Sequence, residues 1–83
     1  MKRQYKRAYN ALKTLGVPVF EREDKPGRFL ISAEHTNSSD WVSYWEAPPT
    51  WNFGVHPALD AVLRQYGLFA EWENPGCLVV CEA

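Results

Sequence analysis

The chain has few of the residues that build metal sites or disulfide frameworks. Its 83 residues include two cysteines and two histidines, and neither a CxxC nor an HxxxH spacing occurs. On an extended strand, Cys77 and Cys81 would lie about 13 Å apart, whereas a disulfide needs Cα atoms about 4.4–6.8 Å apart. We therefore expect no metal site and no bridge between these cysteines. They are interpreted as small buried residues in a reducing compartment, with an intermolecular disulfide left open.

Long apolar runs and glycine-rich loops are also missing. No apolar window of about 18 residues is present, so we expect no membrane span. The basic N-terminus contains tyrosine and lysine in place of an apolar segment, which argues against a secretory signal and favours the cytoplasm. The five glycines are isolated, so no phosphate-binding loop is predicted.

A convergent set of catalytic groups is missing too. Cys81 lies in an apolar segment, whereas a reactive thiolate needs an electropositive and partly exposed setting. Glu71 and Glu73 share one face of a predicted strand, a spacing more typical of surface carboxylates than of an acid pair. We expect a protein that is not an enzyme and needs no cofactor.

Aromatic residues are abundant, with four tryptophans, four tyrosines and four phenylalanines. The length predicts a single domain over residues 1–83. A chain of this size has a small core, and large aromatic side chains can compensate for it. We expect Phe29, Leu30 and Trp45 in that core.

Hydrophobic periodicity predicts two helices. The first spans residues 2–15 and ends at Gly16, with Pro18 preventing its continuation. The second spans residues 57–66, begins at Pro57 and ends at Gly67. The predicted core includes residues from both helices and from three strands: Tyr9, Leu12, Leu15, Phe29, Ile31, Val62, Leu63, Phe69, Leu78 and Val80.

Alternating apolar and polar residues predict strands at residues 17–20, 28–35 and 41–46. Shorter apolar runs at 69–72 and 77–81 flank an Asn-Pro-Gly turn, which favours a hairpin. Residues 47–56 are interpreted as an ordered loop. The order αβββαββ predicts an α+β fold, a two-layer sandwich with an antiparallel sheet of four to five strands and both helices on one face. The other face would carry Trp, Tyr, Ser and Glu side chains.

Charge is sorted along the chain, although the net charge is only −1. Five bases and no acid precede Glu21. After Phe29 there are seven acids and one base, a net charge of −6. This pattern suggests a basic pole and an acidic surface, although a soluble protein also needs charged residues for solvation alone.

Protein binding is the leading functional hypothesis. Trp51 lies in a proline-bounded loop near Phe53, and tryptophan and tyrosine often dominate interface energies. The acidic residues can imitate a phosphate array and occupy the nucleic-acid channel of a partner. The candidate contacts are Glu34, Asp40, Glu46, Trp51, Glu71 and Glu73.

Direct nucleic-acid binding is the alternative hypothesis. The first helix carries bases in its first turn, where they oppose the helix dipole at about 0.3–1 kcal/mol each. Such bases can follow a phosphate backbone, although an isoelectric point near 6.1 is low for that class. The candidate residues are Lys2, Arg3, Lys6, Arg7 and Lys13.

Three segments resemble the small accessory proteins of tailed phages and other mobile elements. They are residues 15–20 (LGVPVF), 29–34 (FLISAE) and 66–76 (YGLFAEWENPG). Acidic, enzyme-free proteins of this size resemble the anti-CRISPR class, whose members bind effector complexes and block target DNA. The resemblance implies an inhibitor of a host defence (CRISPR–Cas) complex in the host cytoplasm, if the gene is phage-encoded. The partner would be a host protein or ribonucleoprotein complex, and the inhibitor itself a monomer or weak homodimer.

Overall fold

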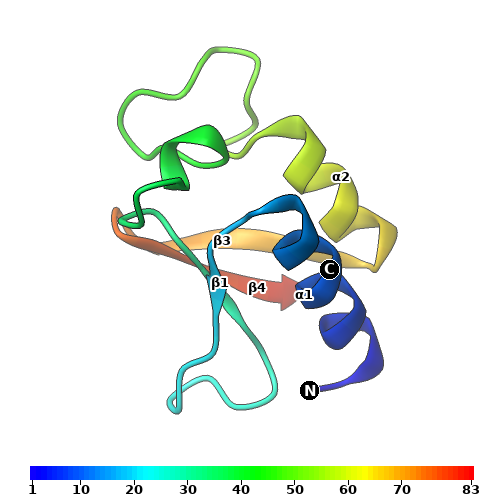
Figure 1. Ribbon diagram of the computed structural model, residues 1–83. Coiled ribbons are helices and arrows are strands. Elements are labelled where there is room, and N and C mark those ends of the chain that lie inside the picture. Colours follow the sequence, from blue (N-terminus) through cyan, green and yellow to red (C-terminus); the bar gives the residue numbers. More distant parts are fainter.

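Two helices lie on one face of a four-stranded antiparallel sheet (Figure 1). The structure is a computed structural model that describes residues 1–83. Its elements are α1 (Arg3–Leu15), β1 (Val19–Phe20), β2 (Leu30–Ser32), the 3-10 helix η1 (Ser38–Asp40), α2 (Pro57–Gln65), β3 (Leu68–Asn74) and β4 (Cys77–Glu82). Neither helix combines the length and the apolar character that crossing a membrane requires. The predicted α+β class is confirmed.

The helices end where their sequence predicts. Gly16 adopts the left-handed conformation after α1, with φ of 91°. Pro57 occupies the first turn of α2, and the His56 side chain accepts a hydrogen bond from the Ala58 N–H, which satisfies a free donor at the helix start. The amide of Gln4 in α1 donates to the carbonyl of Tyr66 at the end of α2, at 3.0 Å. This bond links the two helices.

The strands follow the order β1-β2-β4-β3, so the last strand of the chain lies inside the sheet. β3 and β4 form the predicted hairpin, in which Ala70 lies opposite Val80. The Gly76 N–H donates to Asn74 Oδ1 at 2.7 Å in the turn. Because β3 is last in the strand order, it is an edge strand, and one of its sides faces away from β4.

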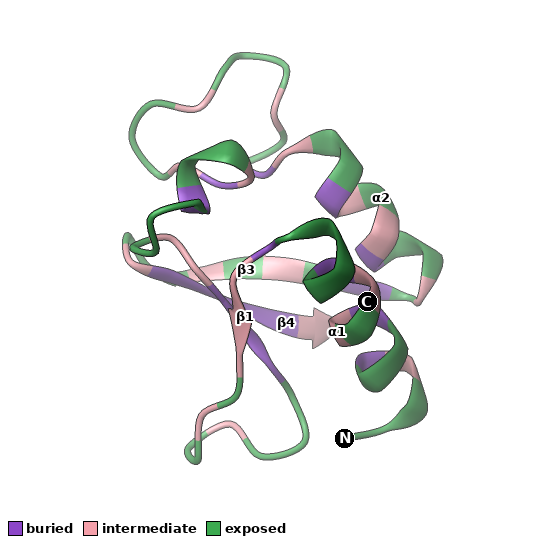
Figure 2. Ribbon diagram, in the orientation of Figure 1, coloured by how far each residue is buried: buried purple, intermediate pink, exposed green.

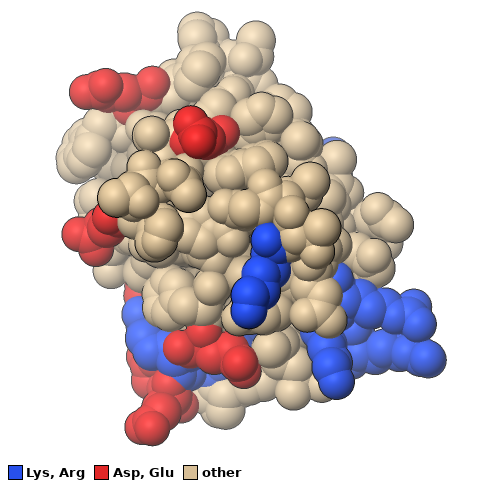
Figure 3. All heavy atoms as spheres, viewed as in Figure 1, with Lys and Arg blue, Asp and Glu red and all other residues tan.

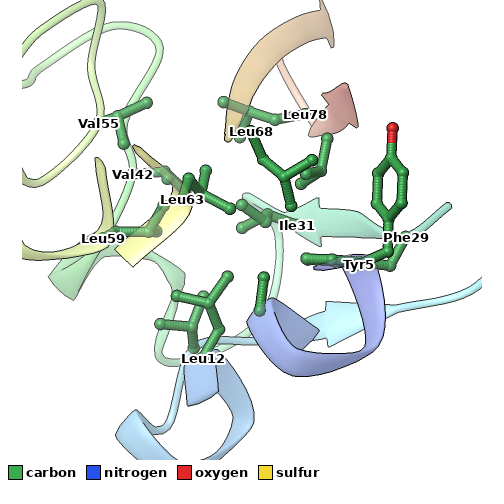
Figure 4. Packing of buried hydrophobic residues seen from close by; sticks show 13 residues of the cluster. Tyr5, Leu12, Phe29, Ile31, Val42, Val55, Leu59, Leu63, Leu68 and Leu78 are labelled. Carbon is green, nitrogen blue, oxygen red and sulfur yellow. The ribbon is translucent and has the colours of Figure 1, made fainter. Parts of the chain in front are cut away.

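The main core lies between the helices and the sheet. Figure 4 shows Leu12, Leu59 and Leu63 from the helices converging on side chains of the sheet. Phe29 is fully buried, and the rings of Tyr5 and Tyr9 meet its ring edge to face at 6.4 and 5.4 Å. Edge-to-face packing of this kind adds stability beyond area burial.

Six of the ten predicted core residues are fully buried: Leu12, Phe29, Ile31, Leu63, Leu78 and Val80. Tyr9 and Val62 are half-buried against the same cluster. The prediction is wrong for Leu15 and Phe69, which are exposed. Leu15 is in the last turn of α1, beyond the sheet contact, and Phe69 points to the sheet face opposite the helices.

The strand predicted at residues 41–46 does not form. Its place is taken by η1 and a loop, in which Val42 makes only an isolated bridge to Val55. The N–H groups of Trp41 and Val42 both donate to the Ser38 carbonyl at 2.9 Å, so they are not available to a ladder. The buried Ser38 hydroxyl ties this turn to β2 by donating to the Ser32 carbonyl. The element order is therefore αββαββ, and the strand predicted at 28–35 shortens to β2.

The sheet face opposite the helices is partly covered rather than open. A small cluster of Leu30, Cys77 and Val79 is buried there, and Phe20 and Cys81 pack against it. Figure 2 shows β4 buried along most of its length. The β1–β2 loop covers this face, with Arg22 reaching across to Glu73 in β3. The expected Trp and Tyr side chains are absent from this face because the strand at 41–46 does not exist.

Candidate interaction surface

Residues 41–56 form a loop whose two ends are held together. The Ser43 N–H donates to the Gly54 carbonyl at 2.9 Å, and the His56 N–H donates to the Trp41 carbonyl at 2.8 Å. Between these bonds, Val42 pairs with Val55, and both valines are buried. A loop with clasped ends presents its side chains from a defined frame. We call residues 43–54, which lie between the clasped ends, the aromatic loop.

The His56 side chain packs against a tryptophan of the aromatic loop and helps to hold the loop in place. Its ring lies between those of Trp41 and Trp51, at centroid distances of 5.4 and 5.2 Å. Its Nδ1 atom accepts the Ala58 N–H at 2.9 Å, which anchors the ring to the first turn of α2. Trp51, a candidate contact from the sequence, is half-buried and thus also supports the loop.

Trp72 of β3 connects the aromatic loop to the sheet. Its indole N–H donates to the Phe53 carbonyl at 2.6 Å. The Tyr44 ring meets the Trp72 ring edge to face at 5.2 Å, and Trp45 packs on Tyr44 at 4.7 Å. A continuous row of aromatic rings therefore runs from Trp72 in β3 through Tyr44 to Trp45 in the aromatic loop.

Several of these rings are exposed. Phe53 is 85% exposed and Trp45 is 78% exposed, while Tyr44 and Phe69 are exposed to smaller extents. Two surface hollows of about 420 Å³ each share Phe53 and Trp72. The first continues over Trp45, Pro48 and Trp51, and the second over Phe69, Ala70 and Glu71. We call Tyr44, Trp45, Phe53, Phe69 and Trp72 the aromatic surface.

The backbone beneath Phe53 is unusual. Phe53 has φ of 50° and is the only non-glycine residue with positive φ. A bulky residue in that region is strained. Gly54 follows at φ of 78°, and a Cβ atom there would lie 2.2 Å from the Ser43 carbonyl oxygen. The close approach of the two loop ends therefore requires glycine at 54.

The sequence prediction that Trp45 lies in the core is wrong. The alternation Trp41-Ser43-Trp45 imitates one face of a strand, but no strand forms, and Trp45 points to solvent. Phe53 carried a weak signal, because a Phe-Gly pair follows Trp51 and two prolines in the same short loop. Nothing in the local pattern of β3 indicated that Trp72 would support the loop.

The acidic candidates divide into free and paired groups. Glu34, Asp40, Glu46 and Glu71 are exposed and make no ion pair. Of these, Glu46 lies on the aromatic loop and Glu71 lines the hollow beside Phe69. Glu71 is therefore at the rim of the aromatic surface, and Glu46 directly follows Trp45 in the chain.

Glu73 is different, because both its carboxylate oxygens accept bonds from Arg22, at 2.6 and 2.9 Å. Arg22 also pairs with Asp24. These bonds, with a further one from the Cys77 thiol at 3.1 Å, lower the pKa of Glu73 to about 2. Burial and the bond to Glu73 raise the pKa of Cys77, so this thiol is not activated. Glu73 therefore has a structural role on the outer sheet face.

Four of the basic candidates lie on α1, and the fifth, Lys2, immediately precedes it. Figure 3 shows a cluster of lysine and arginine where Figure 1 places this helix, and acids on the opposite side of the molecule. Lys2 pairs with Glu82 at 2.9 Å, which raises the pKa of Lys2, and Lys13 lies 5.8 Å over the Tyr9 ring. Arg3, Lys6 and Arg7 are exposed and make no ion pair.

No three His, Cys, Asp or Glu side chains lie close enough together to hold a metal ion. Comparison of the chain with protein-family models, curated proteins and solved structures finds no match. The function of the protein is therefore inferred from its surface.

Proposed function

We propose that this protein is a non-enzymatic binding module that docks on a protein partner through its aromatic surface. The observation that carries the proposal is Phe53, an 85% exposed aromatic side chain on left-handed backbone. Such strain costs on the order of 1–3 kcal/mol and tends to cluster at functional sites. In the isolated chain, neither the strain nor the exposure contributes stability. A partner that covers Phe53 would supply the missing contact.

The composition and rigidity of the surface support this proposal. Tryptophan and tyrosine are enriched at the centres of interfaces, where a single desolvated ring is worth about 2 kcal/mol or more. The clasped backbone ends, the His56 support and the Trp72–Phe53 bond hold the rings in place before binding. Preorganisation of this kind reduces the entropy lost on association.

More specifically, we propose that the protein acts in the cytoplasm as an inhibitor of a host defence complex. The resemblance to phage accessory proteins motivates this form, and the free acids support it. Glu46 and Glu71 would face a basic, nucleic-acid-handling surface of the partner, while Glu34 and Asp40 would add to the steering field. Rim charges of this kind speed association more than they add affinity.

Phage plaquing on hosts that express the protein tests the proposal. We expect wild-type protein to restore plaquing on CRISPR-active hosts and to change nothing on CRISPR-null hosts. The double variant W45A/F53A should lose the effect, and Leu15→Ala should keep it, because Leu15 is an exposed apolar residue on α1. Equal plaquing on all CRISPR types would overturn the inhibitor form.

The docking surface itself is tested with a purified partner. If affinity capture from the native host yields an effector or another complex, W45A/F53A should bind it at least about tenfold more weakly than Leu15→Ala. Equal binding by the two variants would overturn the aromatic surface as the contact.

Nucleic-acid binding by α1 is the second candidate, since the first turn of α1 contains no acid and Arg3, Lys6 and Arg7 have no ion-pair partner. The double variant K6E/R7E should abolish retardation of DNA or RNA at low salt. Lys13→Glu should have a smaller effect, because Lys13 is engaged with Tyr9. Affinity should fall steeply with salt. If micromolar wild-type protein retards neither DNA nor RNA at low salt, this candidate is excluded.

A further inference from the structure

β3 has a free edge beside the aromatic surface. The strand is one of the two outer strands of the sheet, and at seven residues it is the longest. Its bulge near Trp72 and Asn74 ends the regular part of the edge. Natural sheets usually blunt such an edge, because unpaired N–H and C=O groups are a template for another strand.

The hydrogen-bond pattern identifies the free groups. The Ala83 N–H donates to the Gly67 carbonyl, and the Val80 N–H donates to the carbonyl of Phe29, the residue before β2 on the other side of β4. In an antiparallel pair, every second residue directs its N–H and C=O toward the neighbour. Phe69 and Glu71 therefore bond to β4, while the N–H and C=O of Ala70 and Trp72 point away. No other group of the chain bonds them.

The space beside these groups is hollowed rather than filled. Phe53, Phe69, Ala70, Glu71 and Trp72 line the second hollow of about 420 Å³. Ala70 and Trp72 are half-buried, so the edge is reachable at these two residues. Leu68 is 1% exposed, so its backbone cannot form hydrogen bonds with a partner strand.

We propose that an extended segment of the partner, alternating apolar and basic side chains, adds to β3 as a fifth strand. This inference rests on the proposed function, because the same aromatic surface receives the apolar side chains. The unpaired backbone N–H and C=O groups of β3 can form hydrogen bonds with an extended chain, which favours a strand as the bound segment. Trp72 lies on the helix side of β3, so it selects, with Phe53, apolar side chains on one face of the added strand. Glu71 lies on the opposite side of β3 and selects basic side chains on the other face.

A second copy of this chain fits the edge less well. Two β3 strands paired antiparallel about Ala70 would bring Glu71 of each copy diagonally close to the other. Like charges at that spacing repel and destabilise the pair. Glu73 does not change this comparison, because Arg22 already neutralises it.

Amide hydrogen exchange measured by NMR tests the edge directly. The probe is a seven-residue peptide in which lysine and valine alternate. In the free protein, the amides of Ala70 and Trp72 should exchange fast, and those of Phe69 and Glu71 slowly. At saturating peptide, exchange of the Ala70 and Trp72 amides should slow at least about tenfold. This is the reduction expected when one or two hydrogen bonds form to the peptide.

Two matched peptides serve as controls. The same peptide with glutamate for lysine should not protect these amides, and a version N-methylated at alternate residues should bind at least about tenfold more weakly. No protection by millimolar lysine–valine peptide would overturn the proposal, and so would equal protection by the glutamate peptide. Protection that rises with protein concentration alone would identify a second copy as the occupant and overturn the peptide form.

Ala70→Pro separates the edge from the rest of the surface. Proline removes an N–H that faces away from β4, so the ladder and the protection of Phe69 and Glu71 should persist. The variant should lose binding of the peptide and of the captured partner. If Ala70→Pro binds the partner normally while W45A/F53A does not, the strand addition fails and the proposed function stands. If both variants bind normally, the proposed function fails as well.

Discussion

Phe29 and Phe53 are the same residue type in two opposite settings. Phe29 is fully buried between α1 and the sheet, with Tyr5 and Tyr9 against its ring. Phe53 is 85% exposed beside the clasped end of the aromatic loop and lies on left-handed backbone. The core region gains stability from its aromatic residue, whereas the loop is held by its backbone and presents its aromatic residue to solvent. This difference separates the part of the molecule that stabilises the fold from the part available to a partner.

The largest expected effect is on stability when each phenylalanine is shortened. Phe29→Ala should lower the free energy of unfolding by about 3–5 kcal/mol, because it removes a fully buried ring and leaves a cavity. Phe53→Ala should change it by no more than about 0.5 kcal/mol. Urea unfolding followed by circular dichroism measures both. Similar losses for the two variants would remove the distinction between core and loop.

Gly54 and Gly27 form a matched pair for the loop backbone. Their φ angles are 78° and 76°, but only at Gly54 would a Cβ atom meet another group, the Ser43 carbonyl. Gly27→Ala should lower the free energy of unfolding by about 1–2 kcal/mol, the cost of a left-handed alanine. Gly54→Ala should lower it further, since the loop ends must separate. Denaturant unfolding compares the two, and equal losses would show that the close approach contributes nothing.

A smaller effect is expected for the bond between the sheet and the loop. Trp72→Phe removes the indole N–H and leaves the Phe53 carbonyl unpaired, which should lower the free energy of unfolding by about 0.5–1.5 kcal/mol. Trp45→Phe removes an indole that makes no hydrogen bond and should change stability little. Thermal and denaturant unfolding of both variants measure the difference. A larger loss for Trp45→Phe would contradict the supporting role of Trp72.

The smallest effect concerns the paired and free carboxylates of β3. The folded-state pKa of Glu73 is about 2, below its ordinary value of 4.5. Glu73 therefore contributes stability that is present above pH 4.5 and is lost as the pH falls toward 2. Glu73→Gln should flatten the fall in unfolding free energy over this range. Glu71→Gln breaks no ion pair and is the matched control. Unfolding of both variants at a series of pH values from 7 to 2 measures these effects. Identical profiles would contradict the distinction between the paired Glu73 and the unpaired Glu71.

The sequence alone determined the elements with strong periodicity and clear ends. α1 and α2 follow from apolar stripes that end at glycine, and the β3–β4 hairpin follows from its turn residues. These signals are local, because a helix face or a tight turn is specified within a few residues. The α+β class followed from them, as did the burial of Phe29 and Leu63.

Only the tertiary structure decided what happens between residues 41 and 56 and which acids are free. An alternating run such as Trp41-Ser43-Trp45 forms a strand only if its N–H groups find a ladder, and here Ser38 accepts two of them. Glu71 and Glu73 have the same pattern in sequence, but Arg22, 51 residues before Glu73, pairs with only one of them. Periodicity reports which side of a strand a residue occupies. It contains no information about partners that chain folding brings from far along the sequence.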